Sequence, residues 1–274
     1  MGINKLNGKV IQINIVVCVK QVPNNKTISY NIDTNSVQNL SYVMNSRDEV
    51  AVEEALRIKN MTSQGNVWVV TVGPPRAEEV LRKCLAMGAD KATHIWDATF
   101  EGVDAYALSV ILAKAISKLD YDLVLCGSKS DDEGNGFVGA CIAEILRIPY
   151  VSGIIKLEIF PTNKKAVAHK RLEKGDSEVV KCPIPAVLAV DKGLNQPRYV
   201  SIRKQKAALE SEIIKLDASS LKIESEIIKP MTKYLAVSQP KPRLKKGFTI
   251  DSSLPADERM NLILSGGFKK KEQI

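Results

Sequence analysis

The amino-acid sequence predicts an α/β fold, in which a doubly wound parallel sheet carries a C-terminal arm. Up to about residue 200, short apolar runs rich in β-branched residues alternate with amphipathic helical patterns. This order is typical of a parallel sheet that is covered by helices on both faces. Beyond residue 210 the periodicity weakens, and proline and lysine become frequent. We therefore predict an α/β domain over residues 1–210. From the residues alone, residues 211–274 form either a loose tail or an extended arm that lies on another protein.

Apolar runs predict the strands of this sheet. Those expected to be parallel are nearly continuous in apolar residues, because such strands are buried on both faces. They cover residues 13–19, 66–73, 92–97 and 122–127. The pattern then changes to that of antiparallel strands around a turn at 161–165, before it returns to a buried strand. These later segments cover residues 153–160, 165–173, 177–181 and 182–190.

Helical patterns connect the strands and make the fold Rossmann-like. They cover residues 46–60, 76–88, 104–119 and 141–147, and a short helical stretch lies at 256–264. Ser46 and Glu49 have the spacing of a capping box. Asp104 is a good N-cap, and Gly88 is placed to end its helix. In such a fold ligands bind beyond the C-terminal ends of the strands, where three loops would gather: 20–25, 73–75 and 127–136.

Cysteine and histidine are too sparse to indicate a metal or catalytic centre. The five cysteines are widely spaced and form no Cys-x-x-Cys pair, so we expect reduced, mostly buried thiols. With only two histidines, His94 and His169, histidine-based catalysis and metal binding are both disfavoured. We predict no catalytic residue and no metal ligand.

Charge and hydropathy limit the partners and the location. The net charge is +8, and +6 of it lies in residues 201–274, but the lysines there are mixed with glutamates and few aromatics accompany them. This favours a solvated surface or an acidic protein partner over nucleic acid. No apolar run approaches the ~20 residues of a membrane span, and the N-terminus does not have the pattern of a signal peptide. We expect no membrane insertion and a cytoplasmic location.

The segment CGSKSDDEGNGFVGA, residues 126–140, is the strongest candidate site. Its acids, Asp131, Asp132 and Glu133, are consecutive, so they cannot easily converge on one ion, and a calcium-loop spacing is absent. An acid pair for catalysis would need two carboxylates in different environments, whereas adjacent loop acids are more often solvated. Both the metal site and the catalytic pair are therefore disfavoured.

An anion-binding loop fits the same segment better. Glycines follow a buried strand and precede a helix, so backbone N–H groups and the helix N-terminus could face one phosphate. Gly134, Gly136 and Gly139 would permit close backbone approach. They match Gly-x-Gly-x-x-Gly letter for letter, but a dinucleotide fingerprint should follow the first strand at once. From the residues alone, a nucleotide loop and a plain surface connection both remain open.

Taken together, several segments resemble the electron transfer flavoprotein beta subunit. The likeness runs from about Ile13 to Leu209, through VVCVKQVP, MNSRDEVAVEEALRIK, VVTVGPPRAEEVLRKCLAMGAD, DLVLCG and LNQPRYVSIRKQKA. The most specific segment is AHKRLEKGDSEVVKCPIPAVLA, which follows the family's signature except at Lys174, where the family prefers Gly or Asp.

This resemblance implies a fold and a function. The fold would be adenine nucleotide alpha hydrolase-like. The chain would pair with an electron transfer flavoprotein alpha subunit that carries most of the FAD contacts. The heterodimer would pass electrons from a flavin-containing dehydrogenase to a quinone, NAD or ferredoxin. The beta chain would hold AMP in respiratory members, or a second FAD in electron-bifurcating members. A loop near residue 230 would contact the dehydrogenase, and the arm would wrap the alpha subunit.

The resemblance and the glycine-bearing loop together predict the cofactor-binding residues. They are Cys18, Val19, Lys20, Asn45, Thr71, Val72, Gly73, Cys126, Gly127, Asp132, Gly134, Asn135, Gly136, Phe137, Val138 and Gly139. Two departures stand out. The family's Met-Asn-Pro motif has Ser46 in place of Pro, and Asp-Gly-Asp-Thr-x-Gln-Val-Gly of bifurcating members is DEGNGFVG here.

Other functions remain as alternatives. A nucleotide-binding, universal-stress-like regulatory domain would share the fold without a redox role. The arm and the signature segment argue against it. A ligase of the pyrophosphatase type would need a Ser-Gly-Gly-x-Asp-Ser loop after the first strand, where this chain has KQVPNN.

Overall fold

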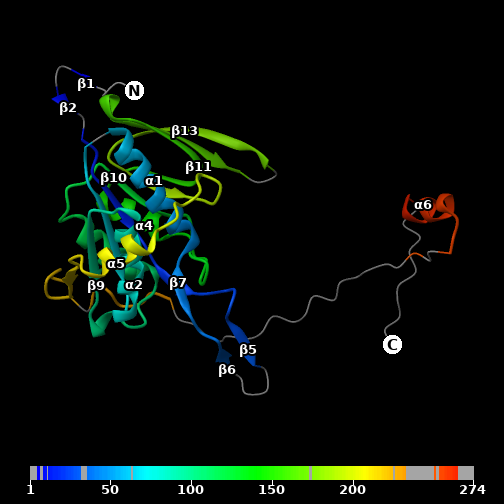
Figure 1. The fold of residues 1–274 in the computed structure, drawn as a ribbon, viewed down its shortest axis with the longest axis horizontal. Helices are drawn as coiled ribbons and strands as arrows, with labels where there is room; N and C mark the ends of the chain where they lie inside the picture. The colour runs from blue at the N-terminus through cyan, green and yellow to red at the C-terminus, as the bar shows by residue number, and fades with distance from the viewer. Residues whose placement is uncertain are drawn as a thin grey trace. The chain divides into compact units, whose positions relative to one another are not determined.

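The computed structural model describes most of the chain. The described residues are 5–6, 9–10, 12–31, 36–62, 64–172, 175–224, 226–232, 250 and 253–264. They belong to two compact units, residues 1–233 and residues 234–274. The first unit contains the α/β domain (Figure 1). In the second unit the helix α6, Ala256–Leu264, has the bounds that the sequence predicts.

The first unit is built on a mostly parallel central sheet. In the described part of the chain its strand order is β13-β12-β11-β14-β10-β3-β8-β9-β15. All neighbours from β11 to β15 pair in parallel, whereas β11, β12 and β13 form an antiparallel extension. The strands are β3 Ile15–Cys18, β8 Val67–Val72, β9 Lys91–Ile95, β10 Leu123–Gly127, β11 Tyr150–Phe160, β12 Lys165–Arg171, β13 Ser177–Pro183, β14 Ala186–Val190 and β15 Ile214–Leu216.

Helices cover both faces of the sheet, as the alternating sequence pattern predicts. They are α1 Ser46–Thr62, α2 Glu78–Met87, α3 Ala105–Ile116, α4 Val138–Leu146 and α5 Ile202–Leu209. One core cluster contains buried residues of α1 and α2, and the other contains buried residues of α3 and α4. Because the side chains of each parallel strand alternate between these two cores, both strand faces are apolar. The fold is α/β and doubly wound, as predicted.

The strand order has a switch point between β3 and β10. From β3 the chain proceeds outward through β8 to β9, and it then returns to add β10 on the other side of β3. The loops that leave β3 and β10 therefore turn toward opposite faces and open a crevice between them. The crevice lies at the carboxyl ends of these strands, next to the glycine-bearing loop.

Several local predictions are confirmed. The Asp104 side chain accepts a hydrogen bond from the N–H of Ala107 and caps α3, and Gly88 ends α2 with φ of 123°. The turn at 161–165 joins β11 to β12, which pair in antiparallel fashion. Residues 233–249 of the expected arm lie outside the described residues.

Other local predictions are wrong. The expected strand 182–190 is divided, because Cys182 and Pro183 end β13 and a cis peptide bond before Pro185 separates them from β14. The helix expected at 141–147 begins earlier, at Val138. Ser46 does not form the expected capping box, because it is already helical and its hydroxyl donates to Asp131.

Several elements were not expected, and helix α5 is among them. The antiparallel pair β4 Gln21–Pro23 and β7 Tyr42–Met44 precedes α1, as do β5 Ser29–Asn31 and β6 Ser36–Gln38, which extend from the body of the domain in Figure 1. Near the N-terminus, β1 Lys5–Leu6 pairs with β2 Lys9–Val10. Strand β15 pairs in parallel with β9 and forms an edge of the central sheet. Among the described residues, none of the helices combines the length and the apolar character that a bilayer span requires.

Candidate functional site

A cleft opens at the switch point of the sheet. It is lined by the carboxyl ends of β3 and β10, by the start of α3, and by the loop between β10 and α4. It has about 680 Å³ of empty space. A second hollow of about 820 Å³ borders it at Lys20, Val72 and Leu108 and continues past Gly73. Both hollows are open to solvent, and they lie at the end of the sheet where doubly wound folds bind their ligands.

The base of the cleft, which we call the floor, is organised by Asp48 of α1. Its carboxylate accepts hydrogen bonds from the N–H of Lys20, at 2.8 Å, and from the N–H of Gly127, at 2.9 Å. These N–H groups follow β3 and end β10, so one side chain ties together the two strand ends that border the switch point. A side chain at position 127 would collide with it, since a Cβ there would lie 2.4 Å from Asp48 Oδ1.

Burial dominates the electrostatics of the floor. It raises the pKa of Asp48 from 3.8 to about 7, although hydrogen bonds from Lys20, Asn45 and Gly127 oppose the rise. Burial also raises the pKa of Cys18 to about 12, and it raises the pKa of Cys126 well above its usual value. The two thiols therefore remain protonated and act as apolar surface rather than as nucleophiles.

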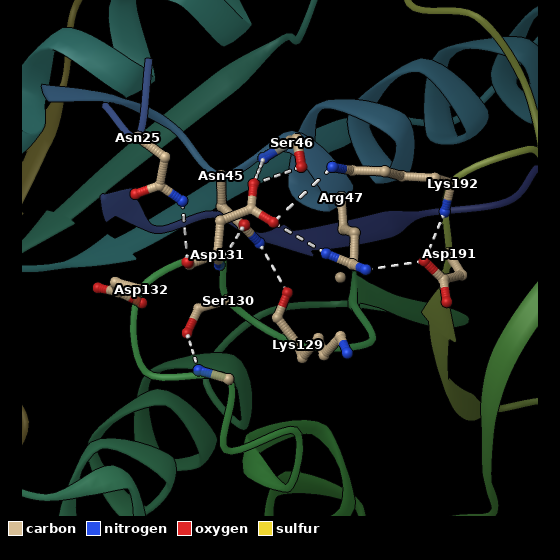
Figure 2. A network of polar contacts seen from close by, with 12 residues as sticks. Asn25, Asn45, Ser46, Arg47, Lys129, Ser130, Asp131, Asp132, Asp191 and Lys192 are labelled. Carbon is tan, nitrogen blue, oxygen red and sulfur yellow. Dashed lines mark hydrogen bonds and ion pairs between the residues drawn. The ribbon is translucent and has the colours of Figure 1, made fainter. Parts of the chain in front are cut away.

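The loop between β10 and α4 is fixed at Asp131 (Figure 2). The Asp131 carboxylate accepts hydrogen bonds from the N–H and the hydroxyl of Ser46. Arg47 Nη1 donates to its Oδ1 at 2.9 Å, and Lys192 Nζ lies 3.8 Å from the same atom. The Nε of Arg47 donates to Asp191 at 2.8 Å. Partial burial alone would raise the pKa of Asp131, but the Ser46 donors and the charges of Lys192 and Arg47 hold it below its usual value.

Lys20, which lines the cleft, contacts the next two acids. Its Nζ lies 2.9 Å from Asp132 and 3.0 Å from Glu133. Burial alone would lower the pKa of Lys20, but the hydrogen bonds and charges of these carboxylates raise it. The acidic run thus meets cations along its length, which reduces its repulsion of an anionic ligand.

The loop glycines have two different roles. Gly134 and Gly136 have φ of 67° and 72°, in the left-handed region that favours glycine. Gly139 is instead required for packing, because a Cβ there would lie 2.8 Å from Cys126 Sγ and 3.1 Å from the Tyr150 ring. That all three glycines permit close approach by a ligand stays a prediction, and packing alone already requires glycine at position 139.

The loop after β8 forms the other side of the cleft region. The Thr71 hydroxyl donates to the Val19 carbonyl at 2.7 Å, and His94 Nε2 donates to the Gly73 carbonyl at 2.8 Å. The buried Thr71 therefore holds β8 against β3, while His94 holds the backbone that turns toward the second hollow. Neither side chain lines the cleft of 680 Å³.

Comparison with known proteins decides the family. Residues 36–221 match the family described as "Electron transfer flavoprotein domain". The chain belongs to the electron transfer flavoprotein family. It is 36% identical over 238 residues to "Electron transfer flavoprotein subunit beta" of Thermoanaerobacterium thermosaccharolyticum, covering 83% of this chain and 88% of that protein. It is 39% identical over 191 residues to "Caffeyl-CoA reductase-Etf complex subunit CarD" of Acetobacterium woodii, covering 69% and 72%. It is 34% identical over 250 residues to "Protein FixA" of Azotobacter vinelandii, covering 86% and 88%.

These matches confirm the resemblance to electron transfer flavoprotein beta subunits. They do not favour the universal-stress-like alternative.

The cleft brings together most of the residues that sequence reasoning selected from the family's pattern. Those lining it are Cys18, Val19, Lys20, Val72, Cys126, Gly127, Asn135, Gly136, Val138 and Gly139. Gly73 lines the second hollow. The others, Asn45, Thr71, Asp132, Gly134 and Phe137, lie behind or beside the lining. Asn45 for example accepts from the Asp131 N–H and donates to the Lys129 carbonyl.

Sequence reasoning missed part of this site. The lining residues outside every predicted site are Asp48, Ala105, Leu108 and Leu112. Within the candidate loop, the lining residues that were not selected as cofactor-binding are Ser128, Lys129, Ser130 and Glu133. In the sequence, Asp48 resembles any acid in the first turn of a helix. Its role depends on contacts with strand ends that are 28 and 79 residues away in the chain. In the described part of the chain, no group of His, Cys, Asp and Glu is arranged to hold a metal ion.

Proposed function

We propose that this chain is the beta subunit of a heterodimeric electron transfer flavoprotein, which carries electrons from a flavin dehydrogenase to a downstream acceptor. One observation carries the proposal beyond family membership. The cleft lies at the switch point of a doubly wound sheet, where such folds bind nucleotides, and the family's nucleotide motifs converge on it.

The ligand that we propose for the cleft is an adenine nucleotide, either FAD or AMP. Val72, Leu108 and Leu112 offer an apolar wall for a planar ring system. On the opposite side, α4 begins without a side-chain cap among the described residues, so its first N–H groups can receive a phosphate. A bound FAD would supply the redox chemistry. The residues of this chain would orient the nucleotide and shield it from water.

The acidic loop is compatible with an anionic ligand. Asp131 is paired with Arg47 and Lys192, and Asp132 shares Lys20 with Glu133. Lys129 and Ser130 also line the cleft and add a cation and a hydroxyl. Because Lys20 is already engaged, the phosphate would be held mainly by backbone N–H groups and by these loop side chains.

The partners follow from the family. The name of the Acetobacterium protein describes a complex with a reductase, and the other relatives include beta subunits. We propose an alpha subunit and a flavin-containing dehydrogenase as partners, with residues 211–274 contributing the partner-binding loop and the arm. Flavin-based bifurcation with NAD and ferredoxin, and a cytoplasmic location, are further parts of this proposal.

A nucleotide count tests the proposal. The chain is purified with its alpha subunit, the nucleotides are released by acid, and FAD and AMP are quantified per heterodimer. Two adenine nucleotides per heterodimer are expected. Two FAD would indicate the bifurcating type, and one FAD with one AMP would indicate simple transfer. A colourless, nucleotide-free complex would contradict the proposed function.

A further inference from the structure

Asp131 shapes the cleft without lining it. The loop residues on either side of it contribute to the lining, namely Ser128, Lys129, Ser130, Glu133, Asn135 and Gly136. The Asp131 carboxylate instead points toward the start of α1 (Figure 2). Its contacts therefore determine where its neighbours are placed.

Three separate elements hold this one residue. The start of α1 provides the Ser46 donors and the Arg47 guanidinium. Asn45 fixes the backbone, since its Oδ1 accepts from the Asp131 N–H at 3.1 Å. From the segment after β3, Asn25 Nδ2 donates to the Asp131 carbonyl at 3.2 Å. Lys192, after β14, adds its charge.

Ser46 connects this arrangement to a departure from the family's motif. Proline is favoured at the first position of a helix because its missing N–H has no helical partner there. Ser46 occupies that position in α1, where the family's Met-Asn-Pro motif has Pro. Both the N–H and the hydroxyl of Ser46 bind Asp131, and proline could supply neither. Ser46 therefore holds Asp131 through two hydrogen bonds that are not needed to start the helix.

We propose that Asp131 is a positioning residue whose bonds to the start of α1 hold residues 128–136 in the conformation that lines the cleft. The effect that we expect of this loop on nucleotide retention rests on the proposed function. A phosphate held by backbone N–H groups needs those groups fixed in advance, because ordering them on binding would cost affinity. Loosening the loop at Asp131 should therefore release the nucleotide faster.

Asp191 provides a matched control. Its side chain is 22% exposed and that of Asp131 is 23% exposed, and each carboxylate binds the same guanidinium. Asp191 however accepts its hydrogen bonds from Arg47 and from the N–H of Lys192, both outside residues 128–136. If charge pairing with Arg47 were all that mattered, the two acids would be equivalent.

The test uses the purified heterodimer and two measurements. Hydrogen exchange reports the order of residues 128–136, and the dissociation rate of the bound nucleotide reports its retention. In Asp131→Ala, hydrogen exchange in residues 128–136 and dissociation of the nucleotide should each be about tenfold faster, because a partly buried hydrogen-bonded charge is lost. Asp131→Asn keeps one acceptor oxygen and should fall between wild type and Asp131→Ala. Asp191→Ala should change the exchange rate and the dissociation rate by less than about threefold.

Ser46→Pro separates loop order from general stability. It should speed exchange in residues 128–136 as Asp131→Ala does, while the thermal midpoint stays the same or rises, since proline suits this helix position. Equal effects of Asp131→Ala and Asp191→Ala would overturn the inference, as would wild-type exchange in Ser46→Pro. If wild type releases no adenine nucleotide, the proposed function fails, and the exchange measurement still decides whether Asp131 anchors the loop.

Discussion

Two carboxylates beside the same strand end have opposite surroundings. Asp48 on the floor is 5% exposed, and burial raises its pKa to about 7. Asp131, in the set of contacts around Ser46, Arg47 and Lys192 that we call the rim, has a pKa held below its usual value. The floor thus joins strand ends through backbone N–H groups in a dry site, whereas the rim joins loops through charges near solvent. We therefore expect the base of the cleft to be rigid and its edge to be adjustable.

The largest expected effect is at the floor. In Gly127→Ala the new Cβ would lie 2.4 Å from Asp48 Oδ1 and 2.7 Å from Arg47 Cβ. The strand end and α1 must then separate, which should cost about 3 kcal/mol. We expect the thermal midpoint of the heterodimer to fall by about 5–10 °C. A midpoint within about 2 °C of wild type would mean that the floor is not rigid.

The next effect concerns pH. The pKa of Asp48 is raised on folding, so its contribution to stability is full below 3.8 and is lost as the pH rises through about 7. The pKa of Asp131 is lowered, so its contribution is present above 3.8 and is lost only as the pH falls below that value. The two acids should therefore respond differently over the neutral range.

Chemical unfolding of the heterodimer at several pH values checks this. The free energy of unfolding of wild type minus that of Asp48→Asn should decrease between about pH 4 and pH 8, because the buried acid loses its proton over this pH range. The same difference for Asp131→Asn should be flat above about pH 5. Parallel curves for the two variants would contradict the contrast between floor and rim.

The smallest expected effect is at the edge of the loop. Gly134 has φ of 67°, and a Cβ there would meet only the Ser130 carbonyl oxygen, at 4.0 Å. Gly134→Ala should therefore cost about 1 kcal/mol, from backbone strain alone. Gly136→Ala is the matched variant, with φ of 72° and the Ser128 carbonyl oxygen at 3.3 Å. Thermal scans should give Gly136→Ala a lower midpoint than Gly134→Ala. The reverse order would mean that packing around this loop is loose.

Much of the fold was predictable, because the local periodicity of the sequence indicates the parallel strands and most of the helices. The apolar run at β10 and the caps at Gly88 and Asp104 needed no tertiary information. Strand β15 was missed because it is short and lies at the sheet edge, where two of its three residues are exposed. Helix α5 was missed because only Ala208 of its residues is buried.

The site was predictable only in outline. Glycines and strand ends indicated the correct loop, since these features are local. The expectation that adjacent loop acids are solvated was wrong for Asp131, whose partner Arg47 lies 84 residues earlier in the chain. Asp48 was missed for the same reason. Contacts of this kind depend on which strands become neighbours, and the sequence pattern alone does not determine that.

The most direct measurement asks whether the nucleotide occupies this cleft. Leu108 of α3 is partly buried and lines both hollows, so Leu108→Trp should fill the space that a nucleotide needs. Tyr106→Trp is the control, on the same helix at a side chain that is 38% exposed. Acid release from the heterodimers should give one adenine nucleotide fewer for Leu108→Trp than for wild type and Tyr106→Trp. An unchanged count in Leu108→Trp would contradict the account, because the nucleotide would then be bound elsewhere.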